Sequence, residues 1–312
     1  MSYYGNYFAE RSRSSALFSD PASRKPGSPP GAGGASAPGE GQVALRDLLE
    51  AKVHGIAFSP YLDGQRPGIE IAEEQIRSRM EILQPYVEWV RTFSCVEGNQ
   101  HSPRVARELG LKTMVGVELS DDLEANEEEL AGGIEVAKAG YADILAVGNE
   151  VLLRGDLTLD QLLEYIERAR EAVPDVPVSY VDAYFVFCDH PRLTAACDAI
   201  LINCYPFWEK CPAENAVHYM SEMVRRTQAV AGDKRVIISE TGWPTQGTPY
   251  GGAVPSFENA RDYAIGAIQW ARNAGVDIFY FSSFDEAWKV GAEGDVGAYW
   301  GLWDSAGEYK FE

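Results

Sequence analysis

The feature of this sequence that most limits its fold is an alternation repeated along most of the chain: an apolar β-branched run, a polar turn, then an amphipathic stretch with helical spacing. Strands are predicted at residues 53–58, 89–94, 113–118, 144–148, 176–181, 199–203, 235–240 and 277–282. Helices are predicted at residues 72–83, 103–109, 124–139, 159–172, 191–197, 213–231 and 257–273. Thr158 and Ser256 stand where N-caps would support two of these helices.

Strands that alternate with helices pair in parallel through right-handed crossovers. The eight strand-like runs are the number that closes a (β/α)₈ barrel. We therefore predict the α/β class and a single (β/α)₈ TIM barrel. The alternative is an open doubly wound sheet, which is less attractive because the sequence has no Gly-rich phosphate-binding loop.

The two ends of the chain differ in composition. Residues 1–42 are rich in Ser, Gly, Pro and Ala, which predicts a disordered tail. A short amphipathic piece at 43–52 leads into the first strand. The 46% apolar content is ample for a buried core, so we expect one domain over residues 43–312.

The charge balance limits the partners. A net charge of −20 repels nucleic acid and anionic membranes and favours a neutral or cationic partner. No run approaches the length of about eighteen apolar residues that predicts a membrane span. The first twenty residues lack the apolar core of a signal peptide, which favours the cytoplasm.

The cysteines predict no metal site. The five cysteines form no CxxC pair and no zinc-type spacing with histidine. Cys204 and Cys211 could pair, but without an export signal buried free thiols are favoured. We expect neither a metal nor a cofactor.

The carboxyl ends of barrel strands are where chemistry is assembled, so the side chains there are the candidates for a site. Glu150 and Glu240 each follow a predicted buried strand, and their carboxylates should therefore point from one rim into a common cleft. The other residues at strand ends are Ser59, Pro60, Tyr61, Asn149, Asp182, Tyr184, Asn203, Tyr205, Trp243, Phe284, Asp285 and Glu286.

Two carboxylates on one rim have three possible uses. A metal site lacks support because no histidine stands at the strand ends, and a structural ion pair has Lys289 as its one obvious cation. Glycoside cleavage suits the pair better, with one carboxyl as the acid and the other as nucleophile or base. Asn149 could then hold a sugar hydroxyl, and Trp243 could stack on a sugar face.

Five motifs carry a family resemblance. The segments LAVGNEV, NCYPF, ISETGWP, FDEAWK and YWGLW, at residues 145–151, 203–207, 238–244, 284–289 and 299–303, resemble in order and spacing the glycoside hydrolases of family 17. The resemblance runs from about residue 53 to residue 303. It implies a retaining endo-1,3-β-glucanase, or alternatively a 1,3-β-glucanosyltransferase. It also implies a (β/α)₈ barrel that binds β-glucan, and we expect a monomer.

The resemblance also implies residue roles. Glu150 matches the general acid/base and Glu240 the nucleophile, while Asn149 matches a residue that holds the sugar 2-hydroxyl. Retention further predicts that the two carboxyl groups lie about 5 to 5.5 Å apart. The other predicted substrate-binding residues are Tyr61, Asn203, Tyr205, Trp243, Phe284, Glu286 and Lys289, and the candidate sugar platforms are Tyr184, Phe207, Trp208, Trp243, Trp288 and Trp300.

Some alternatives stay open at this point. The opening GIAFSPYLDG, residues 55–64, is closer to bacterial members, some of which remodel β-glucans rather than degrade them. A barrel that binds glucan without cleaving it, and a glycosidase of another linkage, are further alternatives. The compartment is also open, because the substrate class usually lies outside the cell.

Overall fold

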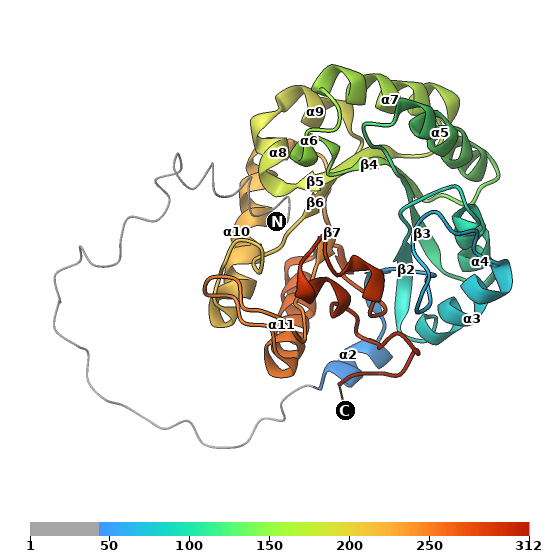
Figure 1. Cartoon of the computed structure of the whole chain (residues 1–312). Coiled ribbons are helices and arrows are strands. Elements are labelled where there is room, and N and C mark those ends of the chain that lie inside the picture. The colour runs from blue at the N-terminus through green and yellow to red at the C-terminus, as the bar shows by residue number, and fades with distance from the viewer. Residues whose placement is uncertain (1–43, 312) are drawn as a thin grey trace, which may run out of the picture.

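The computed structural model describes residues 44–311, which form a closed barrel of eight parallel strands in chain order (Figure 1). The strands are β1 Val53–Ala57, β2 Val87–Arg91, β3 Lys112–Val117, β4 Ile144–Asn149, β5 Val178–Ala183, β6 Ile200–Asn203, β7 Val236–Thr241 and β8 Ile278–Tyr280. Pairing of β1 with β8 closes the barrel. The predicted fold class and the eight strands are confirmed, whereas the predicted disordered tail lies outside the described residues.

Helices surround the barrel (Figure 1). They are α2 Leu45–Glu50, α3 Glu73–Leu83, α4 Ser102–Glu108, α5 Leu123–Lys138, α6 Val151–Arg154, α7 Leu159–Ala172, α8 Tyr184–Asp189, α9 Pro191–Ala196, α10 Ala213–Ala231 and α11 Phe257–Ala274. Short 3₁₀ turns are η2 Asn99–His101, η3 Ala287–Lys289 and η4 Asp295–Ala298. The predicted helices are confirmed, but α6 and α8 were not predicted because such short turns show no helical periodicity.

Local sequence signals define two helix starts as predicted. The Thr158 hydroxyl accepts from the Gln161 amide, and the Gln161 side chain accepts from the Thr158 amide in return, which forms a capping box for α7. The Ser256 hydroxyl accepts from the Asn259 amide at the start of α11. These bonds satisfy amides that the first helical turn leaves without partners.

The core has two layers because the strands bury both faces. A large outer layer packs the helices on the strands, and a smaller cluster fills the barrel interior. The inner cluster consists of Met114, Ile144, Ala146, Val181, Ala199, Leu201, Ile237 and Phe279, with Trp89 packed against it. This packed interior leaves the rim as the place for a cleft.

The strand pairing is irregular near the carboxyl ends. The register shifts between Ala146 and Asn149 where β4 meets β5, between Ile202 and Asn203 where β6 meets β7, and between Ile238 and Thr241 where β7 meets β8. Such irregularities re-aim side chains beside active sites. All three lie next to the predicted site.

The structure also answers two questions that the sequence raised, on the cysteines and on membrane-spanning helices. All five cysteines are free thiols, so Cys204 and Cys211 do not pair. None of the helices within residues 44–311 is long and apolar enough to cross a membrane.

Candidate active site

A cleft of about 720 Å³ opens at the carboxyl rim of the barrel. Its walls include side chains from β4, β7 and the segments that follow β1, β2, β3, β6 and β8. Both predicted glutamates lie in it, together with Asn149 at the end of β4. The structure therefore brings the main predicted residues into one cavity.

Glu240, near the end of β7, is held by residues from two other strand ends. One carboxylate oxygen accepts a hydrogen bond from the Arg91 guanidinium, and the other accepts from the Tyr205 hydroxyl. Arg91 and Glu240 are only 1% and 5% exposed, so the two charges form a buried ion pair. The Arg91 guanidinium also lies 4.3 Å over the Phe93 ring.

Glu150 is joined to the same group of residues through amides. Asn203 donates to the Glu150 carboxylate at 2.7 Å and to the Asn149 side-chain oxygen at 3.3 Å. Asn149 also accepts from Arg91 at 2.9 Å. A continuous hydrogen-bond network thus links the two glutamates, in which Glu240 receives a guanidinium and Glu150 receives a neutral amide. Asn203 is not among the residues that line the cleft, and it contacts the cleft residues Asn149 and Glu150 from behind them in the network.

Glu286 and Lys289 form a second polar group on the opposite wall. The Lys289 ammonium lies 2.6 Å from the Glu286 carboxylate, which also accepts from the Ser59 hydroxyl and the Trp288 indole. Burial acts to lower the pKa of Lys289, but the negative charges of Glu286 and Glu293 outweigh it and raise that pKa. Lys289 therefore stays charged in the cleft.

The aromatic predictions are partly corrected. Tyr61, Tyr205, Trp208, Trp288 and Trp300 line the cleft, together with the unpredicted Phe58, Phe93 and Phe281. Trp243 is wrong as a sugar platform because it is 1% exposed, packs on Phe207 and Tyr263, and donates its indole N–H to the Val254 carbonyl. Phe284, Phe207 and Tyr184 are also buried outside the cleft lining. Phe284 instead supports the Arg79 guanidinium, 3.7 Å from its ring.

The sequence reasoning missed several charged residues of the site, among them Arg91 and Glu118. Arg91 ends β2, but the predicted second strand ran three residues too far, so Arg91 was taken as an interior strand residue. Glu118 lines the cleft directly after β3. The rule that selected Glu150 and Glu240 applies to Glu118 as well, because it also follows an apolar strand.

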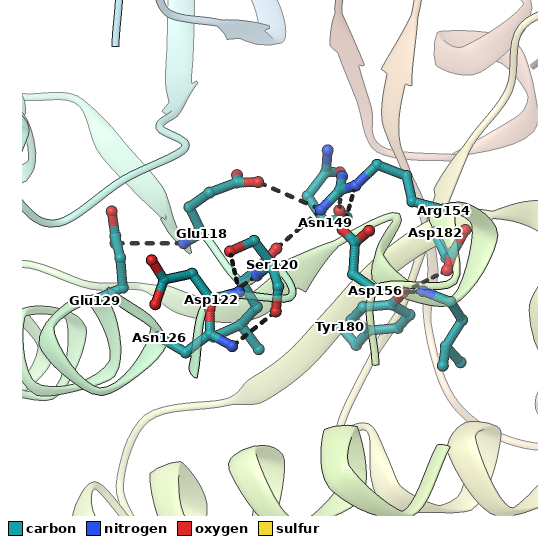
Figure 2. Close-up of polar contacts among 12 residues, drawn as sticks. Glu118, Ser120, Asp122, Asn126, Glu129, Asn149, Arg154, Asp156, Tyr180 and Asp182 are labelled. Atoms are coloured by element: carbon teal, nitrogen blue, oxygen red, sulfur yellow. Dashed lines mark hydrogen bonds and ion pairs between the residues drawn. The ribbon is translucent and has the colours of Figure 1, made fainter. Parts of the chain in front are cut away.

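The cleft is strongly acidic. Eight of its described lining residues are glutamates, and Lys289 is the one lysine or arginine among them. Figure 2 shows Glu118 near Glu129, with the Arg154 guanidinium 3.6 Å from Glu118. Burial raises the pKa of Glu118 to about 7 against the attraction of Arg154, and raises that of Glu293 to about 7 against Lys289. Within residues 44–311, no three His, Cys, Asp or Glu side chains gather as metal ligands.

The sequence matches known proteins over most of the barrel. The sequence model of the BtgE/BtgC glycoside hydrolase domain matches residues 55–301. A glucan 1,3-beta-glucosidase of Candida albicans is 30% identical over 258 residues, which is 74% of this chain and 83% of the relative. The chain belongs to glycoside hydrolase family 17. A glucan 1,3-beta-glucosidase of Schizosaccharomyces pombe is 31% identical over 250 residues, covering 74% of this chain and 78% of that protein.

Solved structures of the family share the barrel. The family 17 beta-1,3-glucanosyltransferase of Rhizomucor miehei superposes with a TM-score of 0.75 at 26% identity, covering 84% of this chain and 96% of that one. An active-site mutant of the same enzyme was solved with laminaritriose. An endo-laminarinase from Formosa has a TM-score of 0.72 at 18% identity, over 84% of this chain and 86% of that one, and shows the shared fold.

Removal of the buried guanidinium tests the network. Arg91→Met leaves the Glu240 charge buried without its cation, so we expect a loss of about 3 to 5 kcal/mol in unfolding free energy. We also expect kcat to fall at least about 100-fold, because a donor to the reacting carboxylate is lost. Urea unfolding and steady-state kinetics measure both. The double variant Arg91→Met with Glu240→Gln should regain stability but not activity. An Arg91→Met protein as stable as the wild type would contradict the role of the ion pair.

A second prediction concerns pH. Burial, and then the charge of Glu150, raise the pKa of Asp182 to about 8 against three hydrogen bonds that lower it. The unfolded value is about 3.9, so the folded protein retains a proton that the unfolded chain has lost. The contribution of Asp182 to the free energy of unfolding is therefore largest below about pH 4. It decreases as the pH rises to about 8, by at most about 1.4 kcal/mol per pH unit.

Unfolding free energies between pH 4 and 8 check this expectation. Asp182→Asn should flatten the decline, whereas Asp160→Asn, on the exposed side of α7, should leave it unchanged. The same slope in the Asp182→Asn variant and the wild type would show that Asp182 does not bind the extra proton.

Proposed function

We propose that this protein cleaves 1,3-β-glucans with retention of configuration, with Glu240 as nucleophile and Glu150 as general acid/base. The observation that carries the proposal is the asymmetric network around the two glutamates. The guanidinium of Arg91 stabilises a negative charge on Glu240, as a nucleophile requires. The neutral Asn203 amide at Glu150 is compatible with a protonated acid. Family membership and relatives named as glucan 1,3-beta-glucosidases support the substrate.

The reaction proceeds in two displacements. A Glu240 oxygen attacks the anomeric carbon, the glycosidic C–O bond breaks, and Glu150 transfers its proton to the departing sugar oxygen. Glu150 then removes a proton from the incoming hydroxyl, whose oxygen attacks the anomeric carbon and releases Glu240. Asn149 lines the cleft and contacts both Arg91 and Asn203, which supports a role in holding the 2-hydroxyl beside the nucleophile.

The incoming hydroxyl decides between two outcomes. Water yields hydrolysis, and a hydroxyl of a second glucan yields transfer. The Trp288 side chain lines the cleft and is 37% exposed, so it offers a face on which an acceptor sugar could stack. The fold shared with the Rhizomucor miehei glucanosyltransferase supports transfer as the second candidate.

Nucleophile replacement tests the assignment. Glu240→Gly should lose turnover of laminari-oligosaccharides, since no glycosyl-enzyme ester can form. Added azide should restore cleavage of an activated β-glucoside and yield a product of inverted configuration, followed by NMR. In the wild type, products longer than the substrate indicate transfer, and shorter products alone indicate hydrolysis. A wild-type product of inverted anomeric configuration would refute the mechanism.

The acidic cleft leads to a prediction on substrate charge. Carboxylates such as Glu97 and Glu128 repel an anionic polymer but not a neutral one. We expect carboxymethylated curdlan to be cleaved more slowly than laminarin in low salt. The difference between the two rates should become smaller as the salt concentration rises. Initial rates at two ionic strengths measure this effect. Glu128→Gln, which removes a charge from the cleft lining, should narrow this difference in rate, whereas Glu127→Gln, next to it on α5 but outside the lining, should not. A difference in rate that does not change with salt would exclude charge as its cause.

A further inference from the structure

We propose that Arg154, Tyr180 and Asp182 act together as positioning residues that hold Glu150 in the geometry needed for proton transfer. We refer to these three residues as the bracket. The inference rests on the proposed role of Glu150 as general acid/base. It concerns side chains that do not line the cleft and so act through Glu150 rather than on the sugar.

The backbone of Glu150 is in an unusual conformation. Its φ of 56° and ψ of 23° are left-handed, which costs a residue with a side chain roughly 1 to 2 kcal/mol. Glu150 also stands at the N-cap position of α6, where the side chain of a Ser, Thr, Asp or Asn would bind the first amides of the helix. Here it makes no such bond, and its carboxylate accepts from Asn203 instead. Surrounding contacts must therefore hold the left-handed turn.

Side chains of β5 bind the amides that Glu150 leaves unbound. The Leu152 amide donates to the Tyr180 hydroxyl at 3.0 Å, and the Leu153 amide donates to the Asp182 carboxylate at 3.4 Å. The Tyr180 hydroxyl in turn donates to Asp182, as Figure 2 shows. Both residues are fully buried. Because these caps come from another strand, the Glu150 carboxyl is available to the cleft.

Arg154 fixes the chain on both sides of Glu150. Its guanidinium donates to the carbonyl of Asn149 at 2.7 Å and to the carbonyl of Leu119 at 2.9 Å, while Asp156 accepts from its third nitrogen at 2.6 Å (Figure 2). Its own amide donates to the Glu150 carbonyl at 2.9 Å. A planar guanidinium can bind these acceptors together, whereas a lysine ammonium lacks that fork.

Loss of the bracket should affect proton transfer more than binding. Without the hydrogen bonds from the bracket, the peptide of Glu150 can relax toward an ordinary right-handed conformation. The Glu150 carboxyl would then move away from Asn203. Substrates with poor leaving groups need the proton from Glu150, whereas a dinitrophenolate leaving group needs little protonation. The two substrate types therefore separate a misplaced acid from general damage.

The test uses Tyr180→Phe and Arg154→Lys. On laminarin we expect kcat to fall about 10- to 100-fold, with KM close to the wild-type value, because the acid is displaced but present. With 2,4-dinitrophenyl β-laminaribioside, the first-turnover burst should keep nearly the wild-type rate. Matched controls are Tyr165→Phe, a buried tyrosine on α7, and Arg170→Lys, an arginine that binds the Ala196 carbonyl away from the cleft. Both controls should keep wild-type kinetics.

Equal losses on both substrates, or no loss on laminarin, would overturn the inference. Amide exchange of residues 150–155, followed by mass spectrometry, supplies a readout that needs no substrate. Exchange there should be faster in Tyr180→Phe than in the wild type, and unchanged exchange would refute the bracket even if laminarin is not the substrate. An inactive wild type with faster exchange in the variant would instead refute the proposed function alone.

Discussion

The buried ion pair between Arg91 and Glu240 is the interaction on which the rest of the site depends. A carboxylate that is 5% exposed carries a desolvation cost of several kcal/mol, which only a close and well-oriented cation can offset. Arg91 does so from β2, and its second nitrogen binds Asn149 on β4. Asn203 then continues the contacts to Glu150. One guanidinium thereby orders four strand ends around a single point.

Position at strand ends makes this geometry rigid. Backbone hydrogen bonds of the closed barrel restrain β4, β6 and β7 up to the strand ends that carry Asn149, Asn203 and Glu240. Register shifts near Asn149 and Glu240 turn these side chains toward the cleft. The segment after β8 contributes differently. There Glu286, Lys289 and Glu293 add charge to the cleft lining, and Trp288 adds an aromatic side chain. The proposed retaining mechanism fits that division, since bond cleavage requires precisely held groups whereas loops can bind an acceptor sugar.

The errors of prediction have physical causes. Trp243 is close to Glu240 in the sequence, but Gly242 packs against the Phe281 carbonyl, where a Cβ would lie 1.9 Å away. The chain therefore turns beneath the rim and buries the indole between Phe207 and Tyr263. The bracket around Glu150 was not predicted, because nothing in the local pattern of Tyr180 or Asp182 indicates that they cap a helix following another strand. Closeness to Glu240 in the sequence therefore did not predict whether a side chain would line the cleft or be buried outside it.

The sequence by itself determined the number and order of the strands, the longer helices between them, and the two carboxylates at strand ends. These follow from apolar periodicity and from motifs a few residues long, which are local properties. Only the tertiary structure decided which groups surround each carboxylate. Arg91 and Glu240 are 149 residues apart, and Asn203 and Glu150 are 53 apart. Closure of the barrel brings such residues together, and the energy of a buried charge depends on those neighbours rather than on the chain beside it.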